Sequence, residues 1–266
     1  MFMKRPVDLE SLLVSGRSIV LNGAGVRLGA PSTIALMEGT HSGLQNVVSG
    51  PAAASAWAPL LRAMMEQAGW MQGQVASPAP ERVVVVTGPG SFTGLRASMA
   101  LAAGLGAGWM CPVWPVPLAD AVRCDVALQG YGRAVDQGVD VLCHARRGRV
   151  FVVPAVGKAY ALALKDQSIE GTPTKGGKLA GFVAGDAVAG PTALPELLTA
   201  LRVRAALQGG KGPMALPCQT PSPKAILLAG AFLAASAGSF APLEPFYVDA
   251  PEAKLPAAGL RPQPHA

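Results

Sequence analysis

The sequence has few of the residues that usually carry chemistry or specific packing. Aromatic residues make up 5% of the 266-residue chain and charged residues 14%. The three histidines are dispersed and the four cysteines show no C-x-x-C spacing, so we expect no metal site and interpret the cysteines as reduced, structural thiols of a cytoplasmic protein. Because half of the residues are hydrophobic, the core must be built mainly from Ala, Val and Leu.

Basic residues exceed acidic ones by 22 to 16, which gives a formal net charge of +6. This excess is compatible with a nucleic-acid neighbour, but the basic residues are scattered and form no run. We therefore expect no direct tRNA binding by this chain alone.

Two apolar windows require a check for membrane spans. Residues 97–119 contain no charged residue, and residues 226–243 are nearly as apolar. The first window contains three prolines and is rich in Ala and Gly, and the second is only about eighteen residues long. The amino terminus has acidic residues and no long apolar core. We expect neither a membrane span nor a secretory signal.

Residues 81–110 predict a strand, a turn and a helix. Four consecutive β-branched residues, 83–86, are typical of a strand buried on both faces. Gly88, Pro89 and Gly90 suit a tight turn, and Ser91 or Thr93 can cap the helix that follows to about residue 108.

The predicted helix has no polar face. One side carries Phe92, Leu95, Met99, Ala102 and Gly106, and another carries small residues, namely Ala97, Ala100, Gly104 and Gly108. We expect the first side to pack on the sheet and the second to pack on another helix. Arg96 is the helix's single charge, and we expect a carboxylate, a turn carbonyl or a partner to satisfy it. The alternative is that its side chain extends into solvent.

The glycine-rich turn has the general form of an anion site at a helix N-terminus. Its spacing is neither that of a Walker phosphate loop, nor the G-x-G-x-x-G of a dinucleotide fold, nor the G-x-S-x-G of a nucleophile elbow. The residues alone therefore favour a turn shaped by its glycines, without chemistry of its own, over an anion site.

Three blocks resemble one known family. The block GPGSFTGLR at residues 88–96 resembles the signature of the TsaB (YeaZ) family, the dimerisation subunit of the bacterial tRNA threonylcarbamoyladenosine (t6A) machinery. PFYV and APEAK, within residues 245–254, are similar to the family's carboxy-terminal segment, and ARRGRVF at residues 145–151 is similar to one of its strand entries.

The resemblance implies an α/β fold of the actin-like ATPase (ASKHA, RNase H-like) class, with mixed sheets flanked by helices in two lobes. We place an N-terminal lobe at residues 1–117, to which residues 224–256 return, and a smaller or degenerate second lobe at residues 118–223.

The chain departs from the family at three positions, one of which is the missing second glycine of the family's G-D-G after Gly185 and Asp186. Asn22 stands where the family's first strand leads to Asp-Thr-Ser, and His144 stands where an aspartate is usual. The acid that a phosphate-and-metal loop would use is therefore absent, and we expect no catalytic residue, no intrinsic cofactor, and ATP or ADP only within a complex.

Two functions remain open. The resemblance implies a non-catalytic scaffold that binds and activates TsaD for transfer of threonylcarbamoyl to adenosine 37 of tRNA, with TsaE in the larger complex, a possible homodimer, and tRNA contacted only indirectly. The alternative is a nucleotide-binding enzyme of the same superfamily with weak ATPase activity. A dinucleotide-dependent oxidoreductase is a remote third candidate, because the glycine spacing is wrong.

The predicted partner interface joins the turn, its helix and a preceding helix at about residues 58–68. Its members are Trp57, Leu60, Leu61, Met64, Gly88, Pro89, Gly90, Ser91, Phe92, Thr93, Gly94, Leu95, Arg96, Ala97, Ala100, Gly104 and Gly108.

The rest of the chain predicts further elements. We expect an opening β-hairpin from strands 17–21 and 32–37, and a second hairpin from strands 139–143 and 149–153. Other predictions are an extended connection at 111–118, a loop at 164–178, a strand at 182–186, an irregular stretch at 208–223 and a helix at 224–237.

Overall fold

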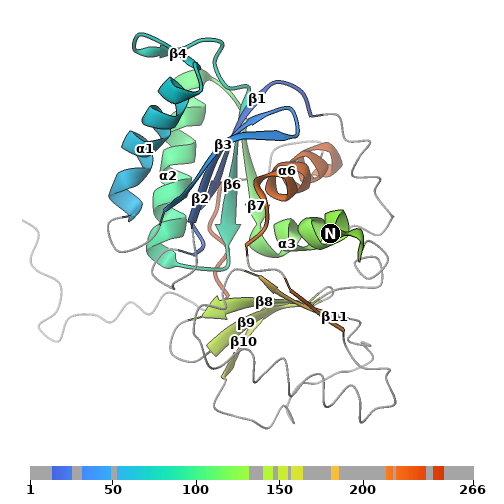
Figure 1. Ribbon diagram of the computed structural model, residues 1–266. Coiled ribbons are helices and arrows are strands. Elements are labelled where there is room, and N and C mark those ends of the chain that lie inside the picture. The colour runs from blue at the N-terminus through green and yellow to red at the C-terminus, as the bar shows by residue number, and fades with distance from the viewer. Residues whose placement is uncertain are drawn as a thin grey trace, which may run out of the picture.

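A computed structural model gives the architecture of the chain (Figure 1). The structure describes residues 14–25, 32–48, 53–131, 140–145, 149–154, 157–163, 181–185, 214–217, 220–237 and 242–248. Within these ranges, no helix is both long enough and apolar enough to cross a membrane.

A five-stranded mixed sheet forms the larger part of the described fold, with the strand order β3-β2-β1-β6-β7. β1 pairs antiparallel with β2 and parallel with β6, while β2–β3 is antiparallel and β6–β7 is parallel. The strands are β1 (Arg17–Asn22), β2 (Ser32–Glu38), β3 (His41–Val48), β6 (Arg82–Gly88) and β7 (Val113–Pro117). The predicted opening hairpin is confirmed by the β1–β2 pair.

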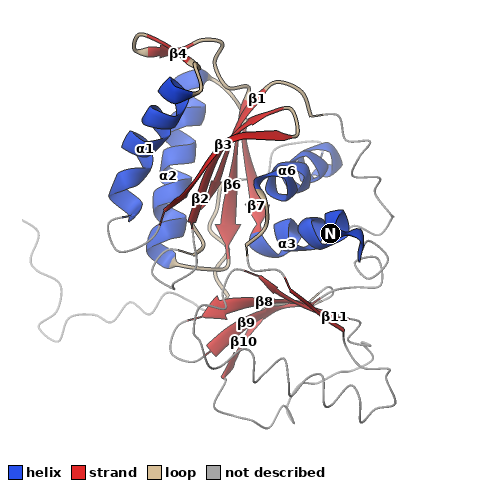
Figure 2. Ribbon diagram, in the orientation of Figure 1, coloured by secondary structure: helices blue, strands red, loops and turns tan. Residues whose placement is uncertain are grey.

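Helices cover both faces of this sheet (Figure 2). α1 (Ala53–Gln67) and α2 (Phe92–Trp109) lie side by side on one face. α3 (Leu118–Val126) and α6 (Pro223–Ala237) pack together on the other. A short ribbon of β4 (Met71–Gln72) and β5 (Val75–Ala76) follows α1, and a π-helical turn, η2 (Ala127–Tyr131), follows α3.

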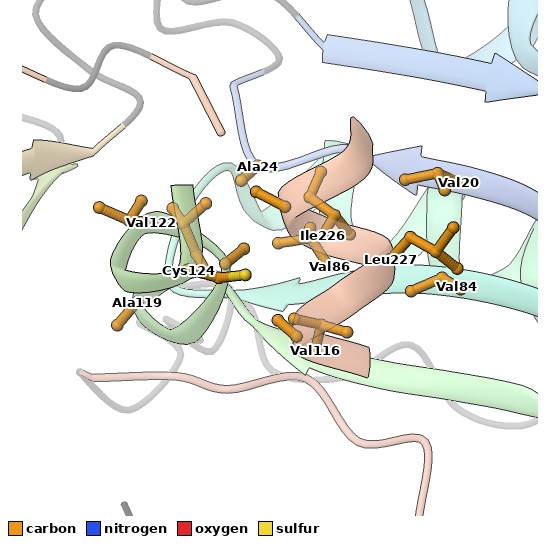
Figure 3. Packing of buried hydrophobic residues seen from close by; sticks show 14 of the residues in the cluster. Val20, Ala24, Val84, Val86, Val116, Ala119, Val122, Cys124, Ile226 and Leu227 are labelled. Atoms are coloured by element: carbon orange, nitrogen blue, oxygen red, sulfur yellow. The ribbon is translucent and has the colours of Figure 1, made fainter. Parts of the chain in front are cut away.

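The valine run of β6 is buried on both faces, as predicted. Val83 and Val85 belong to the core under α1 and α2, whereas Val84 and Val86 belong to the core under α3 and α6. Side chains alternate across a strand, so a strand between two helical layers needs apolar residues at every position. Figure 3 shows Ile226 and Leu227 of α6 in the second core, together with Val84, Val86 and Val116 of the sheet.

A second sheet repeats the topology of the first, with the order β10-β9-β8-β11-β12. Three antiparallel strands are followed by two parallel ones, as in the first sheet. Its strands are β8 (Asp140–Ala145), β9 (Arg149–Val153), β10 (Tyr160–Ala163), β11 (Gly181–Gly185) and β12 (Met214–Pro217). The predicted hairpin is confirmed by the β8–β9 pair, and the strand and helix predicted at 182–186 and 224–237 appear as β11 and α6.

Three predictions about elements need correction, and some elements were not predicted. α1 begins at Ala53, so Pro59 lies inside the helix and not in its first turn, because the preceding alanines are strong helix formers. Residues 113–117 form the edge strand β7 and not a mere connection, since prolines are tolerated at a sheet edge. The stretch predicted to be irregular contains β12, and neither β3 nor α3 was predicted.

Two predictions concern residues that are not described or are described only in part. The loop predicted at 164–178 and Asp186 lie outside the described residues. The lobe boundary after residue 117 stays a prediction; α3, which follows it directly, contacts strands of both sheets, namely β6, β7, β8 and β11.

Candidate functional site

The turn between β6 and α2 is built from residues with special backbone roles. Gly88 has φ of +115°, a conformation that favours glycine. Ser91 has the extended conformation of an N-cap residue, and its Oγ accepts from the Gly94 N–H at 3.4 Å. The predicted helix over residues 92–108 is confirmed, with one further residue at its end.

The turn after β1 packs directly on the turn between β6 and α2. The Ser91 N–H donates to the Ala24 carbonyl at 2.7 Å, and a Cβ at Gly90 would lie 2.7 Å from the Ala24 carbonyl oxygen. A Cβ at Gly23 would overlap the Gly94 carbonyl and the Ser98 hydroxyl. Glycine at both positions is therefore needed for the close approach of the two turns.

Asn22 is fully buried beside this contact. Its Oδ1 accepts from the Ala24 N–H at 3.1 Å, an Asx-type turn in which the side chain stabilises its own backbone. An asparagine held in this way shapes the turn that carries Gly23, and it supplies no carboxylate.

The carboxy-terminal segment 242–248 returns to the same turn. The Phe246 N–H donates to the Thr87 carbonyl at 2.8 Å, and a Cβ at Gly88 would lie 2.8 Å from the Phe246 carbonyl oxygen. The two sequence blocks at 88–96 and 245–248 are thus in contact, although about 150 residues separate them.

Arg96 joins these two blocks through its side chain. Its Nε donates to Tyr247 Oη at 3.1 Å, and its Cζ lies 3.8 Å from the centroid of the Phe92 ring. Phe92 and Tyr247 stack with centroids 5.5 Å apart and an interplanar angle of 27°. Within the described residues, the acceptor for the Arg96 guanidinium is thus a phenol oxygen, and the prediction that a partner protein satisfies Arg96 stays a prediction.

The outer side of α2 is exposed and nearly without bulk. Leu95, Met99, Ala102 and Gly106 are buried on the sheet side, as predicted. Phe92, predicted on that side, is 37% exposed, because it lies at the edge of the buried arc. The small-residue side consists of half-buried Ala97 and exposed Ala100, Gly104 and Gly108.

Part of this small-residue side is not covered by any of the described residues. A Cβ at Gly104 or at Gly108 would meet no atom within 4 Å. Our prediction that this side packs on another helix is therefore not met at Gly104 and Gly108 by the part of the chain that the structure describes.

The predicted interface residues of α1 lie mostly inside. Trp57, Leu61 and Met64 are at most 4% exposed and belong to this chain's own core with α2 and the sheet, and Leu60 is half-buried. The exposed side of α1 instead carries Ala56, Pro59, Ala63 and the ion pair of Arg62 with Glu66, at 2.9 Å. Sequence reasoning picked the apolar stripe of α1, which holds the helix in place.

In the turn, the predicted residues are also mostly buried. Gly88, Pro89, Ser91 and Gly94 are buried, Gly90 is half-buried, and Thr93 is exposed together with Phe92 and Arg96. A surface within reach of another protein at this end therefore consists of the first turn of α2 and the segment against it.

A buried polar network at α3 was missed by sequence reasoning. Arg123, 1% exposed, donates to Asp120 Oδ1 at 3.3 Å and to the Val153 carbonyl at 2.9 Å, which ties α3 to β9. Burial raises the pKa of Asp120, and the Arg123 charge opposes the rise. The network is structural, since it joins the two sheets through α3.

Asp125 connects α3 to α6 in the same way. Its Oδ1 accepts from the Ser222 N–H at 3.0 Å and from the Ser222 hydroxyl at 2.6 Å, and the Ser222 Oγ in turn accepts from the Ala225 N–H. The adjacent Cys124 is buried, which raises its pKa to about 12, so its thiol stays protonated and is a poor nucleophile.

Metal-ligating side chains do not gather anywhere in the described ranges: no group of three or more His, Cys, Asp or Glu could hold an ion there. His144 pairs in register with Val150 in the β8–β9 hairpin. The predicted absence of catalytic, cofactor and metal residues stays a prediction for the chain as a whole.

Comparisons with known proteins agree with this architecture. Residues 52–175 match the family model of TsaD, tRNA N6-adenosine threonylcarbamoyltransferase. The fold is similar to that of YeaZ from Pseudomonas aeruginosa, with 18% identity, a TM-score of 0.57, and coverage of 87% of this chain and 99% of that one. A search of curated proteins found no match.

A second solved structure has the same fold. It is described as an uncharacterized protein with similarity to peptidase YeaZ from Pseudomonas aeruginosa, with 18% identity, a TM-score of 0.56, and coverage of 88% of this chain and 100% of that one. The predicted fold class, an actin-like ATPase fold with helices flanking mixed sheets, is confirmed.

Proposed function

We propose, from the premise that this chain is a TsaB/YeaZ-like protein, that it is a non-catalytic subunit that binds and activates a TsaD-type partner. In this role it supports transfer of threonylcarbamoyl to adenosine 37 of tRNA and leaves the transfer itself to the partner. TsaE joins the larger complex, and tRNA is contacted through the complex.

The exposed side of α2 is the observation that carries this proposal. Ala100, Gly104 and Gly108 follow one another along the exposed side of an 18-residue helix, and open space lies over both glycines. Small residues let a partner helix approach closely, and exposed apolar surface of this kind marks protein contacts. α1 lies beside α2, so two helices can meet two helices of the partner.

The match to the TsaD family over residues 52–175 supports a pseudo-symmetric form of this contact. That range includes the whole of α1 and the whole of α2. Two related folds that use equivalent helices form a contact close to two-fold symmetry. The same surface supports a homodimer when the partner is absent.

The turn around Asn22 supports the non-catalytic part of the proposal. Asn22 uses its side-chain oxygen to accept from the Ala24 N–H, and Gly23 packs on the backbone of α2. A phosphate-and-metal loop at this place needs a carboxylate and room for the phosphates. We propose accordingly that ATP or ADP binds only within the complex, if the partner supplies the groups.

Association with the partner tests the proposal. We call the proposed contact along the small-residue side of α2 the helix seam. Ala100→Trp and Gly104→Leu each place a large side chain on this seam. We expect each change to abolish the complex with the host's TsaD, measured by light scattering of the mixed proteins. Ala235→Trp is the matched control, because Ala235 is an exposed alanine on α6, on the opposite face of the sheet.

All three variants must remain folded by circular dichroism for the comparison to count. Undiminished binding by folded Ala100→Trp and Gly104→Leu would show that the complex uses another surface. Absence of any complex between the wild-type chain and TsaD would overturn the proposed function itself.

A further inference from the structure

Arg96 differs from four other described arginines because part of its guanidinium is not hydrogen-bonded within the described ranges. Its Nε is used by Tyr247, and neither Nη1 nor Nη2 bonds to an acceptor within the described ranges. By contrast, each of the other four pairs with a carboxylate of this chain; they are Arg17, Arg62, Arg82 and Arg123. Arg96 thus presents a guanidinium fork outward, although its position is fixed.

The surroundings hold this guanidinium in one orientation. The Phe92 ring lies under it at 3.8 Å, and Tyr247 both bonds its Nε and stacks on Phe92. Tyr247 is itself positioned by the neighbouring Phe246, whose N–H is bound to Thr87. An exposed arginine normally loses much side-chain entropy when it binds a partner. Because Phe92 and Tyr247 already restrict Arg96 in the free chain, less entropy is lost on binding.

The Nη1 and Nη2 end of the Arg96 guanidinium determines which functional group of a ligand it can bind. With Nε engaged, Nη1 and Nη2 remain for two parallel hydrogen bonds, which is the geometry that a planar carboxylate accepts. The positive end of α2 lies one turn away and adds to the attraction for an anion. Arg96 is the single charge of α2, whereas a nucleic-acid backbone is bound by several cations together.

We propose that Arg96, held by Phe92 and Tyr247, receives a carboxylate side chain of the TsaD-type partner at the end of the helix seam. This proposal rests on the proposed function, because it places the contact at the edge of the same α2 surface. It adds the carboxy-terminal segment 245–248 to the partner surface, with Tyr247 as a positioning residue. Arg96 is one turn of α2 from Ala100, so a helix seated on the seam reaches it.

The experiment compares affinities for purified TsaD by isothermal titration at two salt concentrations. We expect Arg96→Gln to weaken binding about tenfold to a hundredfold and to remove most of the salt dependence. Arg96→Lys keeps the charge but not the fork, and should recover only part of the affinity. Lys224→Ala, which removes one exposed charge on the opposite face of the sheet, is the control and should bind like the wild type.

Tyr247→Phe separates positioning from folding. It keeps the ring stack and removes the acceptor for Nε, so thermal stability should stay unchanged while affinity falls about threefold to tenfold. In an Arg96→Gln background the same change should have no further effect, because the hydrogen bond is already lost. Two independent losses that simply add would contradict the positioning role.

A charge reversal identifies the partner group. Arg96→Glu should abolish binding, and replacing one acidic residue of TsaD by Arg should restore it. If Arg96→Gln binds TsaD like the wild type while Ala100→Trp does not, this inference is wrong and the proposed function stands. If Arg96→Gln instead loses tRNA binding by the complex and keeps TsaD affinity, a phosphate is the ligand and the carboxylate proposal is overturned.

Discussion

On one face of the first sheet, α3 directs its charged side chains into the protein, whereas on the other face α2 directs its single charge outward. Arg123 of α3 is 1% exposed and binds Asp120 and the Val153 carbonyl, and Asp125 binds Ser222 at the start of α6. Arg96 of α2 is exposed and is held by Tyr247 and Phe92. The α3 side is completed within the chain, and the α2 side offers a surface.

The same difference holds for the small residues of the two layers. Gly230 of α6 faces Val84, Val116 and Trp114, and a Cβ added there would lie 3.0 to 3.3 Å from their side chains, so its lack of bulk serves contact with the sheet. Gly104 of α2 faces open space. A small residue that meets its own sheet is explained by the fold, and one that meets nothing requires another explanation.

The largest effect expected from the comparison of the α3 and α2 sides is the loss of stability when Arg123 is replaced. Arg123→Ala leaves Asp120 without its charge partner and the Val153 carbonyl without its donor, so we expect the free energy of unfolding to fall by about 3–5 kcal/mol. Chemical denaturation measures it. Arg62→Ala, which breaks the exposed pair with Glu66, is the control and should change stability by less than about 1 kcal/mol. Equal effects of the two changes would contradict an internally completed α3 side.

A smaller effect comes from two glycines of α2 that differ in their side of the helix. Gly106→Ala places a Cβ against the Val113 side chain and 3.2 Å from the Cys111 carbonyl, so we expect a loss of about 1–3 kcal/mol. Gly104→Ala fills open space and should stabilise the free chain by about 0.5–1 kcal/mol, because alanine is the better helix former. Thermal unfolding of both variants measures the two signs, and a loss at Gly104 would mean that this side is already covered in the free chain.

The smallest expected effect is the catalytic activity of the chain alone. We expect the pure chain neither to hydrolyse ATP above background nor to transfer threonylcarbamoyl, because Asn22 supplies no carboxylate and is used by its own turn. Steady-state assays of phosphate release and of tRNA modification measure both activities. A rate that disappears on Asn22→Ala would favour the alternative, an enzyme of the actin-like ATPase superfamily.

Where the sequence pattern was strong, it predicted the elements correctly. The valine run of β6, the apolar Ala-rich α6 and the glycine-bounded α2 all carry continuous hydrophobicity, which a buried element in this fold requires. β3 was missed because its described side chains are mostly exposed and polar, so it shows no apolar alternation. α3 was missed because Asp120, Arg123 and Asp125 resemble solvent-facing charges until their partners are known.

The sequence by itself determined which turns could form and which residue ends the first strand. Gly88 and Gly90 mark a turn that few other residues could build, Ser91 marks the helix start, and Asn22 stands where the family resemblance implies an acid. These are local properties, since each depends on a residue and its near neighbours.

Only the tertiary structure decided which sides of the helices are covered and which distant residues meet. Trp57, Leu61 and Met64 are turned into the core, although the same apolar stripe could equally have been an interface. The contact of Arg96 with Tyr247 spans 151 positions of the chain. No local pattern encodes such a contact, because it arises when the carboxy-terminal segment closes on the turn between β6 and α2.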